Sequence, residues 1–183
     1  MLYFSNPYSL NKKILEAYDH EIMRLPSDDD WVCLRDGDTA FLRHDYGHTI
    51  QRYIDQYQDT GIFTCYASRC HYRCQVLNVA DMENDSILFH HQRAVECATN
   101  LKGQIVELDR KIAGHLMVIR KSTWKKVRGN VFKRAAGKNI LGVDTQISKA
   151  MLSAGFKIRL MRELYILHYL RLAEGFDCTK HLE

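Results

Sequence analysis

Two aspartates separated by one glycine, Asp36 and Asp38, are the residues in this sequence whose types and spacing most directly suggest chemistry. They follow a short apolar run at residues 31–34, so both carboxylates can turn toward one point at the end of a buried strand. Gly37 would allow backbone geometry that strains other residues. Carboxylates of this kind hold Mg²⁺ or Mn²⁺ together with substrate phosphates, although Asp-Gly-Asp is also ordinary turn chemistry.

Two later residues could act together with such an ion. Asp144 stands at the expected start of a helix, where a carboxylate serves either as a general base or as a helix cap. His168 follows an apolar run, where the residues alone favour an interior histidine bonded to the backbone. For Asp144 they leave both choices open.

A second possible metal site is formed by soft ligands, with four of them inside a ten-residue stretch: Cys65, Cys70, His71 and Cys74. They could hold a structural Zn²⁺, although their spacing is irregular for a zinc module. The alternative is that these cysteines pack in a strand and a loop. Reduced thiols in the cytosol are expected for the six cysteines of the chain.

The composition is that of a globular chain. Its 183 residues are 46% hydrophobic and 26% charged, enough for a core, and no apolar run reaches the length of a bilayer span. We expect one compact domain over residues 1–183, located in the cytoplasm. The net charge of +4 is modest, and one dense basic segment at residues 120–138 suggests an anionic ligand, a solvated face or peripheral contact with an anionic membrane. No nucleic-acid partner is expected.

The elements that must position these residues alternate between apolar strands and amphipathic helices, which predicts an α/β fold with a largely parallel sheet. Strands are expected at residues 2–5, 31–34, 61–67, 115–120, 157–161 and 164–167. Helices are expected from a cap at Ser9 to residue 23, at 45–58, at 86–101, briefly around Trp124, and at 144–154 with Gly155 after its end. Residues 68–85 and 128–141 are expected as loops, and the second could close over a ligand.

Three blocks in order carry a resemblance to a known family: WVCLRDGDTAFL at 31–42, AGHLMVIRKSTWKKVRG at 113–129, and LGVDTQISKAMLSAGFKI at 141–158 leading into LYILHYLR. This set resembles glycosyltransferases of family 2, over roughly residues 31–171. The resemblance implies the GT-A fold, a Rossmann-like, mixed but mostly parallel sheet flanked by helices. It also implies Mn²⁺ or Mg²⁺, a nucleotide-diphosphate sugar donor, and a saccharide, lipid-linked or protein acceptor.

The same resemblance assigns roles to the candidate residues. Asp36 and Asp38 match the DxD motif, which reaches the metal and the ribose-diphosphate, and Asp38 is expected to bind the metal directly. His168 matches a histidine that completes the metal shell in several relatives. Asp144 matches the general base of an inverting displacement, in which it takes a proton from the acceptor hydroxyl.

Further contacts follow from the resemblance by position. The nucleotide-sugar side would comprise Ser5, Asn6, Tyr8, Lys12, Arg35, Asp36, Gly37 and Asp38, and the acceptor side would comprise Gly114, His115 and Trp124. A buried core tryptophan is the alternative for Trp124. Only 35 residues precede Asp36, so the nucleotide-binding part is expected to be abbreviated. The alternative functions are therefore a catalytically degenerate sugar-nucleotide-binding module and a structural zinc-binding protein.

Overall fold

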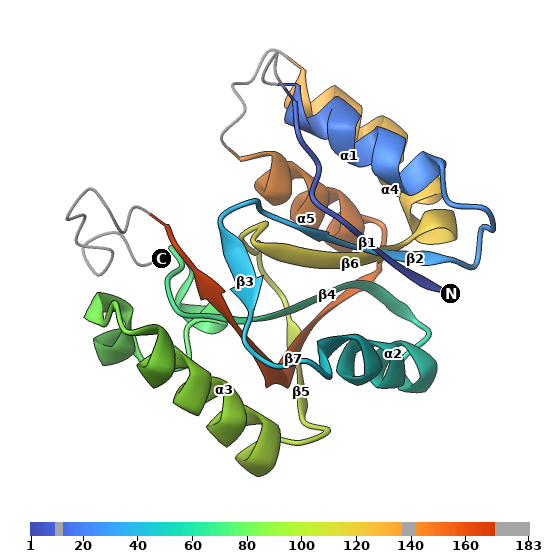
Figure 1. Ribbon diagram of the computed structural model, residues 1–183. Helices are drawn as coiled ribbons and strands as arrows, with labels where there is room; N and C mark the ends of the chain where they lie inside the picture. Colours follow the sequence, from blue (N-terminus) through green and yellow to red (C-terminus); the bar gives the residue numbers. More distant parts are fainter. Residues whose placement is uncertain (10–12, 137–141, 171–183) are drawn as a thin grey trace. The chain divides into compact units, whose positions relative to one another are not determined.

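The computed structural model describes residues 1–9, 13–136 and 142–170, and within them the chain is an α/β protein with a mixed sheet (Figure 1). The strands are β1 (Leu2–Ser5), β2 (Trp31–Arg35), β3 (Thr39–Phe41), β4 (Thr60–Ala67), β5 (Ile105–Leu108), β6 (Leu116–Arg120) and β7 (Lys157–His168). The helices are α1 (Ile14–Met23), α2 (Tyr46–Gln56), α3 (Ile87–Asn100), α4 (Lys121–Ala135) and α5 (Val143–Ser153), with short 3₁₀ turns η1 (Arg73–Gln75) and η2 (Val79–Glu83). The predicted α/β class is confirmed.

The sheet has the order β1-β2-β6-β4-β7-β3, and β5 pairs with β7. Contacts divide the chain into two compact units. The first unit comprises Met1–Gly37, Asp59–Phe63 and Glu107–Arg159. The second comprises Asp38–Gln58, Thr64–Val106 and Leu160–Glu183. Strands β4 and β7 contribute residues to both, and the expectation of one compact domain remains a prediction.

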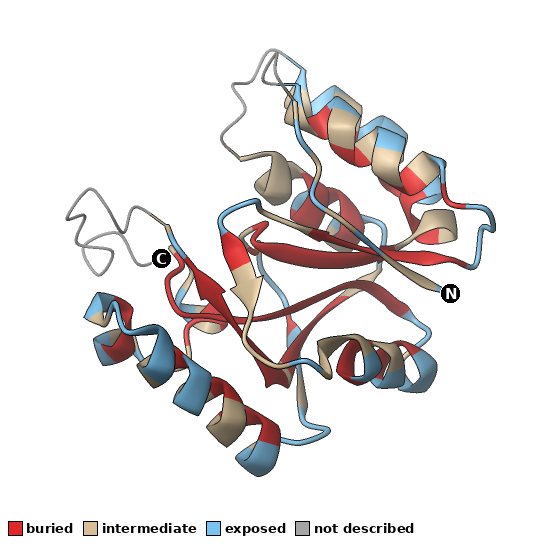
Figure 2. Cartoon of the chain, in the orientation of Figure 1, coloured by how far each residue is buried: buried red, intermediate tan, exposed pale blue. Residues whose placement is uncertain are grey.

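In the first unit, β2 lies between β1, which runs parallel to it, and β6, which runs antiparallel. Residues 31–34 of β2 are all buried, which is why this segment is apolar without alternation (Figure 2). Helix α1 packs on β2 and α4, and α4 also packs on β6 and α5. Leu34 is the last fully buried residue before the aspartates, so the strand delivers Asp36 directly to the end of the sheet.

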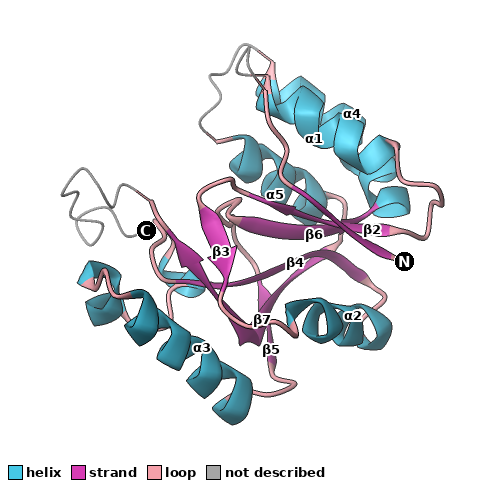
Figure 3. Ribbon diagram, in the orientation of Figure 1, coloured by secondary structure: helices cyan, strands magenta, loops and turns pink. Residues whose placement is uncertain are grey.

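In the second unit, β3 pairs antiparallel with β7, with Thr39 opposite His168 and Phe41 opposite Ile166. Helix α3 begins after Ser86, whose hydroxyl accepts a hydrogen bond of 3.3 Å from the backbone N–H of Phe89. Figure 3 shows helices α2 and α3 of this unit, which loops join to its strands. The β3–β7 pairing places Asp38 beside the end of β7.

Two element boundaries differ from the sequence expectation. Helix α4 continues to Ala135, so much of the predicted loop at 128–141 is helical, and residues 137–141 lie outside the described part. The helix continues because Val127 and Val131 extend the buried stripe that starts at Trp124, while Gly129 is exposed. Strand β7 is a single strand of 12 residues, because the backbone N–H of Arg162 donates to Gln104 and leaves no break.

The sheet is also less parallel than expected. Among the pairings with a defined register, β1–β2 is parallel, whereas β2–β6, β3–β7 and β4–β6 are antiparallel. Strands β3 and β5 were not predicted, because they span only three and four residues and their apolar character is weak. The first helix begins at Ile14, and the Ser9 hydroxyl accepts from the N–H of Lys13 instead of capping a longer helix. None of the described helices is long and apolar enough to cross a membrane.

Candidate metal and catalytic centre

The end of β7 brings His168 and Asp38 together in the second unit. The Nε2 atom of His168 lies 3.5 Å from Oδ1 of Asp38. The backbone adds a second link, because the N–H of Tyr169 donates a hydrogen bond of 2.8 Å to the carbonyl oxygen of Asp38. The imidazole is buried, whereas the carboxylate is half exposed. A ligand from solvent can therefore reach the carboxylate side of this pair.

The hydrogen bonds of His168 determine which ring nitrogen carries the proton. Nδ1 lies 2.8 Å from the carbonyl oxygen of Arg69, which can only accept, so Nδ1 is the donor. Nε2 of the ring and Oδ1 of Asp38, 3.5 Å apart, are the two kinds of ligand atom that a divalent cation can bind together. Histidine ligands of metals commonly donate their other N–H to a backbone carbonyl in this way.

Ser68 and Arg69 hold His168 in this orientation. The backbone N–H of His168 donates to the Ser68 hydroxyl at 2.9 Å, and that hydroxyl donates to the His168 carbonyl oxygen at 3.2 Å. The Arg69 side chain is itself buried, donates to the carbonyl oxygen of Met82 at 2.7 Å, and pairs with Asp85. The predicted loop at 68–85 therefore supports the histidine.

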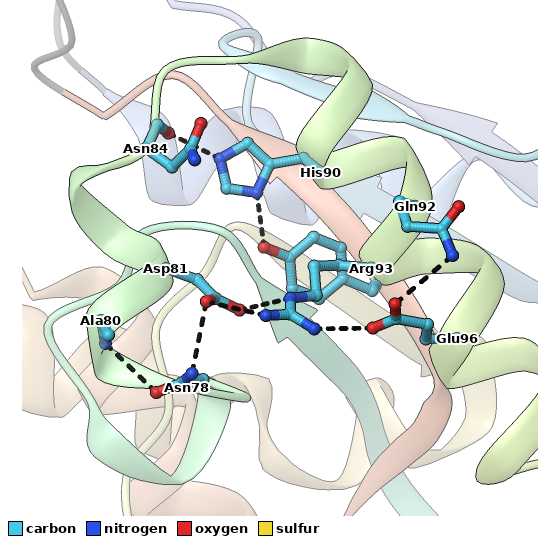
Figure 4. Close-up of polar contacts among 9 residues, drawn as sticks. Asn78, Ala80, Asp81, Asn84, His90, Gln92, Arg93 and Glu96 are labelled. Atoms are coloured by element: carbon cyan, nitrogen blue, oxygen red, sulfur yellow. Dashed lines mark hydrogen bonds and ion pairs between the residues drawn. The ribbon is translucent and has the colours of Figure 1, made fainter.

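A polar network ties the end of this loop to α3 and β7 (Figure 4). Arg93 of α3 pairs with Asp81 of η2 at 2.9 Å and with Glu96 at 2.7 Å. The Nε2 atom of His90 lies 2.7 Å from the carbonyl oxygen of Asn84, so Nδ1 accepts from the Tyr165 hydroxyl at 2.8 Å. Tyr165 lies three residues before His168 on β7. The network thus restrains both the loop that contacts His168 and strand β7, which carries His168.

Asp36 belongs to the first unit and stands two residues before Asp38 along the chain. In the second unit, Asp38 and His168 offer a carboxylate oxygen and an imidazole nitrogen, a donor set that suits Mn²⁺, and Mg²⁺ accepts the carboxylate. The residue types therefore fit a divalent cation.

Within the first unit, the Asp36 and Asp144 carboxylates lie close enough to the Tyr18 hydroxyl to affect its pKa. Burial raises the pKa of Tyr18 far above its ordinary value, and the negative charges of Asp36 and Asp144 raise it further. The phenol is therefore a neutral donor at every physiological pH. The backbone N–H of Asp36 donates to the carbonyl oxygen of His115 at 3.3 Å.

Asp144 lies inside the first turn of α5, and Gly142, with φ of 99°, occupies the N-cap position. The helix-cap interpretation therefore does not describe this aspartate. Its Oδ2 accepts from the N–H of Gly114 at 3.0 Å and its Oδ1 accepts from the N–H of Thr145 at 2.7 Å. Burial raises the pKa of Asp144, and the two backbone donors only partly offset this effect. A half-buried, oriented carboxylate with a raised pKa is suited to proton transfer.

The predicted acceptor-side residues are all buried. Gly114 lies against Asp144, because a Cβ there would come within 3.2 Å of the Asp144 Cβ and 3.7 Å of the Tyr18 hydroxyl. His115 is completely buried in the same segment. Trp124 is also completely buried, and its indole N–H donates to Asp19 at 2.8 Å. Trp124 is therefore a core residue in this structure, as the alternative interpretation has it.

The predicted nucleotide-side residues are spread along the ends of β1 and β2. Ser5 donates to Glu21 at 2.6 Å and lines an open pocket of about 320 Å³ with Arg24 and the β1 aromatics. Asn6 and Tyr8 are exposed, Arg35 is half-buried at the end of β2, and Lys12 lies outside the described residues. Their contact with a nucleotide stays a prediction.

Gly37 does not have the special backbone geometry expected of it. Its φ is not positive, and a Cβ at this position would meet nothing within 4 Å. The zinc interpretation also finds no support in the described residues, where Cys65, Cys70, His71 and Cys74 form no group of three converging ligands. The described cysteines form no disulfide.

Sequence reasoning missed Tyr18, Ser68 and Arg69. Tyr18 fits the apolar spacing of α1 as well as Ile14 and Ile22 do, so nothing in the pattern separates it from a core residue. Ser68 and Arg69 act through hydrogen bonds to His168 across sequence separations of 100 and 99 residues, respectively, which no local pattern records. No family model matches the chain, and no curated protein matches it either.

Proposed function

We propose that the chain is a metal-dependent glycosyltransferase that moves a sugar from a nucleotide-diphosphate donor to an acceptor hydroxyl by an inverting displacement. The observation that carries the proposal is the pair formed by His168 and Asp38, in which Nε2 of the imidazole lies 3.5 Å from Oδ1 of the carboxylate. The hydrogen bond from Nδ1 of His168 to the Arg69 carbonyl oxygen supports it further, because histidine ligands of metals commonly donate their other N–H in this way. The ordered sequence blocks supply the link to sugar transfer.

In this proposal Asp36, Asp38 and His168 hold Mn²⁺ or Mg²⁺. A bound ion would neutralise the charge that develops on a departing nucleoside diphosphate. Asp144 takes the proton from the acceptor hydroxyl as the oxygen attacks the anomeric carbon, and its raised pKa brings its basicity closer to that task. The N–H groups of Gly114 and Thr145 keep the carboxylate oriented. The identity of the acceptor, whether saccharide, lipid-linked or protein, stays a prediction.

Donor hydrolysis and transfer with UDP-, GDP- and CDP-sugars in the presence of Mn²⁺ test the proposal. Asp38→Ala and Asp144→Asn are expected to lower the turnover rate at least 100-fold, on the scale of general base removal. Asp109→Asn is the matched control, because Asp109 is exposed and pairs only with its neighbour Arg110 among the contacts described. Equal turnover in all four proteins would contradict the proposal. Binding of nucleoside diphosphate without transfer would instead favour the degenerate binding module.

A further inference from the structure

Helix α4 carries six basic residues and no acidic residue, so its charge must be balanced from outside the helix. On one side of α4, other parts of the first unit do this. Arg128 pairs with Asp19 of α1 at 2.6 Å, and Lys125 pairs with Asp28 at 2.8 Å. Lys121 donates a hydrogen bond of 2.6 Å to a backbone carbonyl oxygen just after α1. These three side chains are therefore bound within the fold.

The other three basic residues of α4 are exposed and have no acidic partner among the described residues: Lys126, Lys133 and Arg134. Lys126 and Lys133 are about two helical turns apart, so they lie on the same side of α4. The Arg134 guanidinium donates to the hydroxyl of Ser153 on α5 at 3.2 Å. Lys149 is exposed one turn before Ser153, so it extends this group of cations onto α5. We call these four basic residues the basic face.

The basic face has charge of a single sign. Asp144 is the one acidic residue of α4 and α5, and its carboxylate accepts from the backbone N–H groups of Gly114 and Thr145. A solvated protein surface usually mixes the two signs, as the other side of α4 does. Four exposed cations without acidic neighbours create a positive potential that attracts a polyanion.

We propose that the basic face is a docking surface for an anionic membrane, whose lipid headgroups supply the balancing negative charge. Helix α4 packs against both α1 and α5, so it lies within a layer of helices (Figure 1). A helix held in this way cannot enter the major groove of a nucleic acid, whereas contact with a lipid surface requires no such entry. The surface lies in the first unit alone, and it would bind lipid whether or not the chain transfers sugar.

Co-sedimentation of the whole chain with vesicles of phosphatidylcholine and phosphatidylserine, mixed at about 2:1, tests the proposal against vesicles of phosphatidylcholine alone. The chain is expected to bind only the mixed vesicles, and to dissociate as NaCl rises from about 0.1 M to about 0.5 M. Replacing both Lys126 and Lys133 by alanine is expected to lower the partition coefficient about 30-fold, from about fivefold for each lysine near the surface.

The matched control replaces Lys13 and Lys102 by alanine, which removes the same charge from exposed lysines outside the basic face. Its partition coefficient is expected to stay close to that of the wild type, and thermal unfolding checks that both double variants fold. Equal losses in the two double variants would show that net charge alone governs binding and would overturn the proposal. Equal binding of the wild type to both kinds of vesicle would overturn it as well. Tighter binding to double-stranded DNA than to mixed vesicles, at equal phosphate concentration and salt, would assign the basic face to nucleic acid instead.

Discussion

Gly114 donates its backbone N–H to Oδ2 of Asp144 at 3.0 Å. The two residues are so close that a Cβ added to Gly114 would lie 3.2 Å from the Asp144 Cβ. Such a contact is tighter than most between real side chains, so one of the two residues would have to shift. The close approach explains why a glycine serves at this position, where φ is not in the left-handed region.

Gly114→Ala is therefore expected to displace Asp144 by a few tenths of an ångström and to destabilise the fold by about 1 kcal/mol, the low end for overpacking. Turnover is expected to fall about tenfold or more, since small displacements of a catalytic group have large effects on rate. Gly129→Ala is the control, because Gly129 is exposed on α4 and a Cβ there meets nothing within 4 Å. Chemical denaturation and transfer assays measure the two effects, and equal turnover in the two variants would contradict the assignment of Asp144.

The raised pKa of Asp144 gives a prediction on pH. The folded chain binds the Asp144 proton more tightly than the unfolded chain, whose carboxyl titrates near 3.8. Between the ordinary pKa and the raised pKa, the free energy of unfolding from this group falls as pH rises. The rate of transfer should rise through the raised pKa, because the base must be ionised.

Asp144→Asn is expected to remove this contribution to the pH dependence of the free energy of unfolding, which urea denaturation between pH 4 and pH 7 measures. Asp109→Asn, at an exposed position, should leave the pH dependence as it is in the wild type. A wild-type curve and an Asp144→Asn curve that run parallel over this range would show that Asp144 titrates as an ordinary carboxyl.

The strands and helices with a strong local pattern were predictable from sequence. The uniformly apolar strand at Trp31–Arg35 and the capped helix at Ile87–Asn100 were predicted nearly to the residue. The end of α4 was not predicted, because the basic residues around Gly129 resemble a loop. Val131 continues the buried stripe of α4, which becomes evident only when the helix is packed. The short strand Thr39–Phe41 forms through its pairing with β7, which the local sequence does not encode.

The candidate centre was predictable in its charged residues but not in their support. Asp38 and His168 were singled out, and the structure places them 3.5 Å apart. Their spacing in the sequence alone could not predict that Arg69 supplies the carbonyl that orients the imidazole, because main-chain acceptors carry no residue signature. Tyr18 was not singled out because its ring packs as a core residue, so its spacing in α1 is that of an ordinary apolar position.

Metal binding by His168 gives a third prediction. His168→Ala removes one ligand and is expected to weaken Mn²⁺ binding about 100-fold or more, whereas Ser68→Ala removes only the backbone clamp and should weaken it about tenfold. At a concentration 100 times the wild-type dissociation constant, Mn²⁺ should stabilise the wild type by about 2.7 kcal/mol and His168→Ala far less. His91→Ala, an exposed histidine on α3, is the control. Equal thermal shifts in the wild type and His168→Ala would exclude His168 as a ligand.

Chelation distinguishes the carboxylate centre from the soft-ligand alternative. A structural Zn²⁺ contributes its binding energy to folding, so its removal unfolds a small domain or a loop. Here Cys65 and Cys70 are buried in and after β4, the Cys70 sulfur accepts from the N–H of Tyr72 at 3.4 Å, and the described thiols do not converge. We therefore expect purified protein to contain no stoichiometric zinc and to keep its unfolding midpoint in EDTA, while EDTA abolishes sugar transfer. Cys74→Ser should behave like the wild type in both assays. Loss of the folded state in EDTA, restored by Zn²⁺ and not by Mn²⁺, would reverse the assignment in favour of the cysteines.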